Sequence, residues 1–233
     1  MTQKIKVTYI YHSSFILECS GKTLLFDPPG RGFLPGDIWD TIEKQVKNKD
    51  LYVFISHGHG DHYSPRVFDL EAKYTQYIVP DDINYPNNAV VLSDEEIREV
   101  KDLHVRTFKS NDQGVAYLIK LHNRTIYFGG DLAKWDWPEW SKKKRRVHVK
   151  IFKKTLEHLR GLDIDIAFSN MDKRLKSWAG PVDFIDKVKP KYFVPIHTFG
   201  NEEWISDLIE ADTPKETTIV QYYKPGDSIT LNF

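Results

Sequence analysis

The heptapeptide SHGHGDH, residues 56–62, directly follows the apolar run LYVFI at residues 51–55. That run is short and rich in β-branched and aromatic residues, which is typical of a buried strand. His57 and His59 alternate with glycines that let the backbone turn tightly and bring both imidazoles toward one point, while Asp61 and His62 can turn toward a second. Glycine-rich turns seldom hold so many potential ligands after a buried strand. We therefore expect a Zn, Mn or Fe site here rather than a solvated polar turn.

Length and composition set the background for this cluster. The chain has 233 residues, which suits one domain over residues 1–233. Lys plus Arg and Asp plus Glu number 33 each, so no overall charge bias indicates a nucleic-acid or membrane partner. A single cysteine, Cys19, excludes an internal disulfide and fits a reducing compartment. The N-terminus has no signal-peptide pattern and no run is long enough to cross a bilayer, so we expect a cytoplasmic protein.

Short strand-like segments occur in pairs along the chain and are followed by helices. The turn signals Ser20-Gly21 and His122-Asn123-Arg124 predict two hairpins. Apolar residues at helical spacing predict a helix over much of residues 142–160, with shorter helical pieces near residues 181–188 and 202–209. Further strands are expected at residues 104–109, 115–121, 125–130, 164–170, 191–197, 217–223 and 228–233. Because several neighbours are hairpins, two sheets packed face to face with helices outside fit better than a doubly wound parallel sheet.

His57, His59, Asp61 and His62 complete the pattern His-x-His-x-Asp-His. With it occur YHSSFILECSGKTLLFDP at residues 11–28, a Gly-Asp after a strand in IYFGGD at residues 126–131, and a strand-terminal histidine in YFVPIH at residues 192–197. Over nearly the whole chain the sequence resembles the metallo-β-lactamase superfamily, and in particular its lactonase-like small metal-dependent hydrolases.

The resemblance implies an α/β protein with the four-layer αβ/βα sandwich of that fold, holding one or two divalent metal ions (Zn, Mn or Fe). It also implies that Asp131 bridges two metals and that His197 completes the second site beside Asp61 and His62. Taken alone, Asp131 would be an ordinary helix N-cap and His197 a polar residue at a strand exit. The full set favours the ligand interpretation, since a carboxylate can bridge two metals about 3.5–4 Å apart.

This ligand set predicts a hydrolase that activates water. The metals lower the pKa of a bound water, the hydroxide attacks an ester, lactone or phosphoester of a small molecule, and a metal polarises the electrophilic oxygen. The residues expected to take part in catalysis are Asp61, which can orient the hydroxide, and Asp131.

Four other positions are candidates for supporting the ligands or binding substrate. Antiparallel pairing around Ser20-Gly21 brings His12 near Asp27, so both are expected near the metal edge, with Asp27 fixing the tautomer of a metal-bound histidine. A purely structural role for His12 remains open. Asp172 and Arg174 follow a strand and could hold an anionic substrate group, or form a charged surface loop.

The chain departs from the family pattern at one ligand. Most relatives supply a further histidine between the signature and Asp131, where this chain has only His104 and His122. In the hairpin near Asn123, residues equidistant from the turn face each other, which puts His122 roughly 30 Å from Asp131 at about 3.3 Å per residue. The loop at residues 110–113 reaches the right end instead. We therefore expect Asp112 to replace the histidine, which would favour Mn or Fe over Zn; the alternative is a solvent-facing carboxylate.

Rival functions come from the segment after Asp131. Trp135, Trp137 and Trp140 precede an unbroken basic run at residues 142–146, a combination that can bind single-stranded nucleic acid. A nuclease or phosphodiesterase acting on nucleic acid is therefore one alternative, although such a run is usually a solvated helix face and the tryptophans could line a pocket. A non-catalytic metal-binding protein and an iron-dependent oxidoreductase are the others. We favour a small-molecule substrate over a nucleic-acid partner.

Overall fold

A computed structural model describes residues 4–33, 36 and 38–233. The chain divides into two compact units, Met1–Leu92 with Tyr222–Phe233, and Ser93–Gln221, each of which has its own sheet. The single domain predicted over residues 1–233 stays a prediction. Its residues 1–3 lie outside the described residues.

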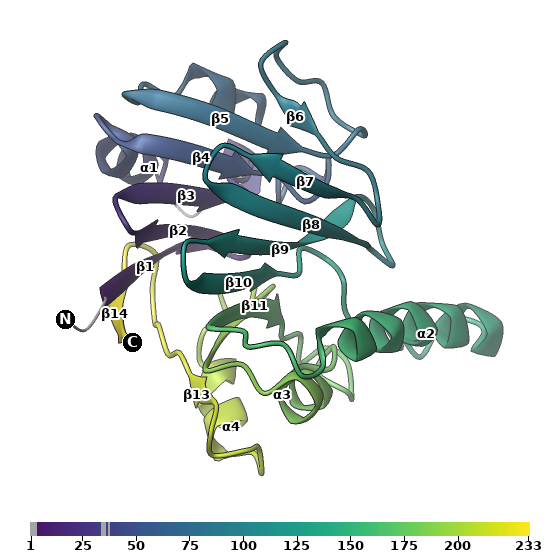
Figure 1. Ribbon diagram of the computed structural model, residues 1–233. Coiled ribbons are helices and arrows are strands. Elements are labelled where there is room, and N and C mark those ends of the chain that lie inside the picture. The colour runs from purple at the N-terminus through teal and green to yellow at the C-terminus, as the bar shows by residue number, and fades with distance from the viewer. Residues whose placement is uncertain (1–3, 34–35, 37) are drawn as a thin grey trace. The chain divides into compact units, whose positions relative to one another are not determined.

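The first unit contains a seven-stranded mixed sheet in the order β14-β1-β2-β3-β4-β5-β6 (Figure 1). Neighbours from β14 to β3 are antiparallel, and those from β3 to β6 are parallel. The predicted hairpin turn at Ser20 and Gly21 is confirmed, and both residues have positive φ (51° and 76°), as a tight two-residue turn requires. The strands are β1 (Lys4–Tyr11), β2 (Ser14–Cys19), β3 (Lys22–Phe26), β4 (Asp50–Phe54), β5 (Tyr74–Val79), β6 (Val90–Val91) and β14 (Ser228–Asn232).

Helix α1 (Trp39–Val46) packs into the core of this unit and was not predicted. Its buried residues Trp39, Ile42 and Val46 recur at helical spacing, but the helix is only eight residues long and carries no side-chain N-cap. Short 3₁₀ segments, Arg31–Phe33 and Pro65–Asp69, complete the unit. Strand β4, which leads into residues 56–62, therefore shares one apolar core with α1.

The second unit repeats the mixed arrangement in the order β13-β12-β11-β10-β9-β8-β7. Here β10 to β13 are parallel and β10 to β7 antiparallel. The hairpin register is the expected one, since Arg124 pairs with Leu121 and Phe128 with Tyr117. The strands are β7 (Ile97–Val100), β8 (Leu103–Lys109), β9 (Val115–Leu121), β10 (Arg124–Phe128), β11 (Ile166–Asn170), β12 (Tyr192–Ile196) and β13 (Thr218–Ile219).

Three helices belong to the second unit: α2 (Lys142–Leu159), α3 (Pro181–Val188) and α4 (Trp204–Glu210). All three confirm helices that the sequence predicted near these residues. Ser141 caps α2, because its Oγ accepts a hydrogen bond from the backbone N–H of Lys144 at 3.2 Å. The buried residues of α2 lie in its second half and its first half is largely exposed.

Two strand predictions need correction. The strand expected at residues 217–223 shortens to Thr218–Ile219, and β7 was missed. Only Val100 of β7 is buried, so the strand has no apolar alternation that the sequence could show.

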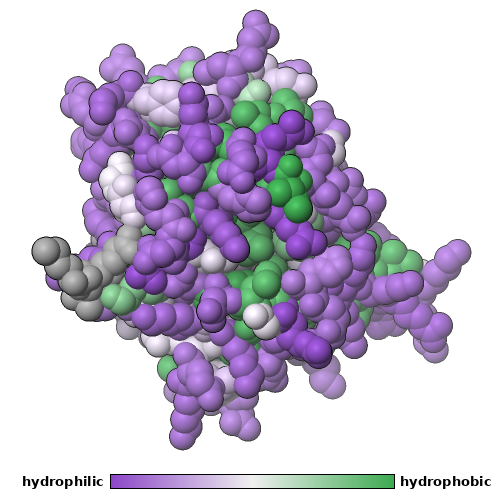
Figure 2. All heavy atoms as spheres, viewed as in Figure 1, coloured by the Kyte–Doolittle hydropathy of each residue, from purple (hydrophilic) through white to green (hydrophobic). Residues whose placement is uncertain are grey.

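The surface is mostly hydrophilic in the view of Figure 2, where hydrophobic side chains show only in small groups. Large exposed hydrophobic residues such as Ile97, Val147 and Tyr223 are scattered along the chain. Among the described residues, no helix combines the length and the apolar character needed to span a membrane.

Candidate metal centre

In the first unit, the candidate ligands lie where parallel strands end. The backbone N–H of Asp27, after β3, bonds to Phe54 O at the end of β4, and Ile55 N–H bonds to Ile78 O of β5. The segment that follows β4 therefore begins at the carboxyl edge of three parallel strands, the place where ligands of α/β sheets commonly bind. His57 and His62, which follow on this segment, are both fully buried.

His57 and His59 bring ring nitrogens together. His57 Nε2 lies 3.0 Å from His59 Nδ1, and the rings are nearly perpendicular at a centroid distance of 4.6 Å. Two nitrogens bound at 2.0–2.1 Å to one tetrahedral cation lie about 3.4 Å apart. The spacing of this pair fits two ligands of one ion.

The glycines of the cluster provide space rather than an unusual turn. A Cβ on Gly60 would lie 2.7 Å from the Phe33 ring, and one on Gly58 would lie 3.1 Å from Ile83 and 3.2 Å from the backbone oxygen of Asp82. Neither glycine has the left-handed φ that a tight turn would need. The expected reason for these glycines is corrected: they allow close packing around the histidines.

Asp27 contacts two residues of the cluster, Ser56 and His62. Its Oδ1 accepts a hydrogen bond from the Ser56 backbone N–H at 2.7 Å, and its Oδ2 accepts one from Ser56 Oγ at 2.6 Å and lies 2.7 Å from His62 Nδ1. Burial raises the pKa of the Asp27 carboxyl, while the contacts with His62 and Ser56 act in the opposite direction. A carboxylate at Nδ1 directs Nε2 of His62 away from itself, which is the usual orientation of a metal-ligating histidine.

His12 and Asp61 lie beside His62. Asp61 Oδ2 is 3.6 Å from His12 Nε2 and 4.0 Å from His62 Nε2. His12 and Asp27 both have left-handed φ, 56° and 40°, which costs free energy in residues with a side chain and tends to occur at functional sites. The structure thus brings together all six candidate residues of the first unit: His12, Asp27, His57, His59, Asp61 and His62.

A second carboxylate–histidine pair lies in the second unit, after β11 and β12. Buried Asp172 Oδ2 is 3.4 Å from His197 Nδ1, and on the other side of the ring His197 Nε2 is 3.7 Å from Asp131 Oδ1. His197, like His12, has a left-handed φ (67°). Burial raises the pKa of Asp172, but hydrogen bonds from Arg174 and His197 outweigh it and hold that pKa well below its usual range.

The backbone around Asp131 is held by Trp135, which the sequence suggested only as a nucleic-acid-binding or pocket-lining residue, and by two asparagines that the sequence did not single out. Trp135 Nε1 donates to Asp131 O at 2.8 Å, and Asn170 Nδ2 donates to Gly130 O at 2.7 Å. Asn111 Nδ2 donates to Ala133 O and its Oδ1 accepts from Ala133 N. The two buried amides tie the loop after β10 to two other segments, so the backbone that carries Asp131 is held in place.

Asp112, the candidate for the missing histidine, lies near Asp131. One carboxylate oxygen of each residue lies within 4.8 Å of the other. Both line a pocket of about 210 Å³. The remaining lining residues are mostly aromatic: Trp135, Trp137, Trp140, Arg174, His197 and Phe199. By contrast, His104 pairs with Lys120 and His122 occupies the turn, at the far end of the hairpin.

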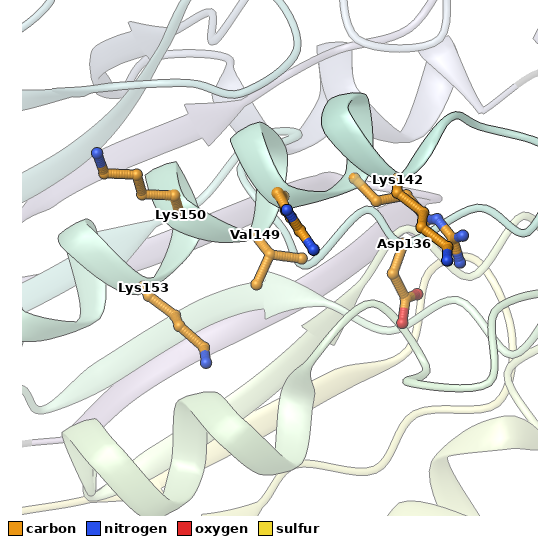
Figure 3. A pocket seen from close by; sticks show the side chains of 7 residues that line it. Asp136, Lys142, Val149, Lys150 and Lys153 are labelled. Atoms are coloured by element: carbon orange, nitrogen blue, oxygen red, sulfur yellow. The ribbon is translucent and has the colours of Figure 1, made fainter.

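Part of the basic run, beginning with Lys142, lines a separate groove along α2 (Figure 3). In that view Asp136 lies beside the first turn of the helix near Lys142, and Lys150 and Lys153 project from later turns. Arg145, Arg146 and Val149 also line this groove. The tryptophans instead line the pocket with Asp131. Trp140 still contacts the basic run, because Lys144 Nζ lies 3.6 Å from the centre of its ring.

Each of the two mixed sheets has histidines and carboxylates at its strand ends, and these are candidate metal ligands in each unit. Residues 6–197 match the family described as Beta-lactamase superfamily domain, a match that runs across both units. The chain belongs to the metallo-β-lactamase superfamily. The predicted fold class is confirmed.

Among similar proteins is one from Desulforamulus reducens named UPF0173 metal-dependent hydrolase, 30% identical over 148 residues, which are 54% of this chain and 62% of that protein. The matched part is thus less than two thirds of that relative. The metallo-β-lactamase fold protein YhfI from Bacillus subtilis has a TM-score of 0.67 at 12% identity, over 98% of this chain and 99% of the other. The diiron β-hydroxylase CmlA from Streptomyces venezuelae has a TM-score of 0.59 at 12% identity, over 99% of this chain and 54% of CmlA.

Proposed function

We propose that the protein is a metal-dependent hydrolase that uses an activated water to cleave an ester, lactone or phosphoester of a small molecule. The observation that carries this proposal is the pair of carboxylate–histidine contacts, Asp27 with His62 and Asp172 with His197. Each carboxylate lies on the Nδ1 side of its ring, at 2.7 Å for Asp27 and 3.4 Å for Asp172, which is where the supporting residues of metal-binding histidines lie. The name of the Desulforamulus reducens relative agrees with this activity.

The donor set fits one or two divalent ions. We assign His57, His59 and Asp112 to one ion, His62, Asp61 and His197 to the other, and Asp131 to both. The close pairs within each unit, His57 with His59 and Asp131 with His197, have separations of 3.0 and 3.7 Å that suit ligands sharing an ion. When bound, such ions lower the pKa of a water and polarise the scissile group.

The residues around the donors would have distinct roles in this reaction. Asp61 is the candidate to accept a hydrogen bond from the attacking water and orient it, because its carboxylate is only partly buried. Trp135 holds the backbone of Asp131, and with Trp137 and Phe199 it forms an apolar wall that would exclude bulk water from the reacting group.

The direct test is metal analysis of the purified protein followed by a panel of esters, lactones and phosphodiesters. We expect bound Zn, Mn or Fe, turnover of at least one ester or lactone, loss of turnover with a chelator, and recovery on adding metal back. Full metal occupancy with no turnover would favour a non-catalytic metal-binding protein. Bound iron with oxygen consumption would favour an oxidoreductase, the class of enzyme to which the diiron β-hydroxylase CmlA belongs.

A phosphodiesterase acting on nucleic acid is the second candidate, favoured by the basic groove of α2. Its cations Lys142, Arg145, Arg146, Lys150 and Lys153 face a single acid, Asp136. Binding of a single-stranded RNA oligonucleotide that weakens with salt, and that is lost when residues 143–146 are neutralised, would support this candidate. Absence of binding at low salt would remove it.

Replacing Asp112 by histidine should shift the metal preference. If Asp112 is a ligand, an imidazole in its place is softer than a carboxylate, so Asp112→His should raise the affinity for Zn relative to Mn. Competition between the two metals, read by elemental analysis after dialysis, measures this ratio. Exposed Asp163→His serves as the control. An unchanged ratio in Asp112→His would show that Asp112 is not a ligand.

A further inference from the structure

Resting on the proposed hydrolase, we propose that Arg174 is an anion-binding subsite and that the substrate is a small ester or lactone carrying a carboxylate or phosphate group. Arg174 lines the same pocket as Asp131 and His197. An anionic group bound by the guanidinium would place a neighbouring ester or lactone carbonyl beside the candidate ligands.

The guanidinium of Arg174 is held in one orientation by Asp172. Arg174 Nε lies 2.8 Å from Asp172 Oδ1, Arg174 Nη2 lies 2.5 Å from Oδ2, and the Arg174 backbone N–H also donates to Oδ1 at 3.0 Å. This two-point contact fixes the plane of the group. A guanidinium is charged at any ordinary pH, and the contact with Asp172 raises the pKa of Arg174 further.

Two aromatic rings enclose the same guanidinium. Its central carbon lies 5.3 Å from the ring centre of Trp137 and 4.8 Å from that of Phe199. Both distances are within the range of cation–π contacts. Ring contacts of this kind restrain the side chain without using its N–H groups.

Donors remain for a ligand after these contacts. A guanidinium has five N–H groups, and its hydrogen bonds among the described residues occupy Nε and Nη2 with one partner, Asp172. The Nη1 edge is left, and the side chain is 50% exposed although its partner Asp172 is fully buried. An arginine that served only to neutralise Asp172 would not need an exposed edge in this pocket.

The size and walls of the pocket limit what can bind. A volume of about 210 Å³ is below the range typical of drug-sized ligands, which favours a small substrate. The indole and phenyl rings that line the pocket suit an apolar or planar group of the substrate, and the guanidinium of Arg174 suits an anionic group. A nucleic-acid strand would need a continuous series of cations, which Arg174 alone does not provide.

Asp172 links this subsite to the candidate centre. Asp172 Oδ2 contacts both Arg174 Nη2, at 2.5 Å, and His197 Nδ1, at 3.4 Å. A substrate anion bound to Arg174 would therefore be connected to His197, a candidate metal ligand, through the carboxylate of Asp172. Because of this connection, Arg174 could instead support His197 through Asp172 without binding substrate. The experiment must therefore separate anion binding from support of His197.

The test compares two 4-nitrophenyl esters of similar length in metal-loaded protein: the neutral butyrate and the anionic monosuccinate. In Arg174→Gln we expect the preference for the anionic ester, as a ratio of kcat/KM values, to fall by about 10- to 100-fold, the range of a lost charge-assisted hydrogen bond. Arg174→Lys should recover part of it. The matched control is Lys173→Gln, a neighbouring cation that pairs with Asp207 and should keep the ratio.

Direct binding supplies a readout that does not depend on turnover. Benzoate and phenyl phosphate should change the tryptophan fluorescence of wild type, because Trp137 packs on Arg174, and the tighter of the two identifies the anion. We expect binding at least tenfold weaker in Arg174→Gln at equal metal content. Equal binding, or an equal fall for both esters, would overturn the subsite. Anion binding that is lost in Arg174→Gln, together with no turnover of either ester or of any compound in the ester, lactone and phosphodiester panel, would retain the subsite and reject the hydrolase.

Discussion

Asp131→Asn is expected to lower kcat/KM of the metal-loaded protein by roughly 10²- to 10⁴-fold on the best substrate of the panel. In the proposed centre Asp131 is the one carboxylate assigned to both ions. Metal-assisted charge stabilisation contributes several kcal/mol, and about 1.4 kcal/mol corresponds to each tenfold change in rate. An amide has the same shape but one acceptor oxygen and no charge, so it cannot replace that role.

The fold should tolerate this substitution. Trp135 donates a hydrogen bond to the backbone oxygen of Asp131, and Asn170 donates one to the backbone oxygen of Gly130. Neither contact involves the carboxylate of Asp131. The melting temperature of Asp131→Asn should therefore stay close to that of wild type when both are measured in chelator. Asp163→Asn, at an exposed carboxylate of the same unit, controls for loss of charge.

Combining Asp131→Asn with His59→Ala tests whether both residues serve one centre. Residues that act as a unit have strongly non-additive effects, so the double variant should be little worse than the more damaging single variant. Elemental analysis should show a matching loss of metal in each. Activity that survives both substitutions in metal-replete protein would contradict the proposed mechanism.

The sequence predicted the parts of the fold that repeat at short range. Helix α2 (Lys142–Leu159) lies within residues 142–160, over much of which apolar spacing predicted a helix, and the hairpin at His122 has the register expected from its turn. That register also separated His122 from Asp131, because equidistant pairing is a property of any tight hairpin. Helix α1 and strand β7 were missed, since neither has a cap or an alternation that a local pattern could reveal.

The contacts around the candidate ligands could not be predicted from the sequence to the same extent. The contact of Asn170 with Gly130 joins residues 40 positions apart, and Asn111 reaches Ala133 across 22 positions. Nothing about an asparagine in the sequence indicates which distant carbonyl it will meet. Ser56 could have been recognised, because it stands between a buried strand and His57, the position from which a hydroxyl can reach a neighbouring strand end.

Asp27→Ala is expected to cost about 3–5 kcal/mol of stability, the effect of removing one partner from a buried charged pair. The substitution removes the carboxylate that accepts hydrogen bonds from the backbone N–H and hydroxyl of Ser56 and contacts Nδ1 of His62, in a site where Asp27 and His62 are fully buried. The Ser56 hydroxyl keeps its contact with His57 Nδ1 at 2.9 Å. For a chain of this length, about 2–4 °C per kcal/mol gives a fall in Tm of roughly 6–20 °C.

Measuring this loss in chelator separates it from metal binding. The apo form of Asp27→Ala should already melt well below apo wild type, and added metal should stabilise the variant less than wild type, because His62 loses the contact that orients its ring. Exposed Asp69→Ala in the same unit should change stability by no more than about 0.5 kcal/mol. If apo Asp27→Ala instead melts with apo wild type, the carboxylate is not a structural support of the cluster. Its contact with His62 would then matter for metal binding alone.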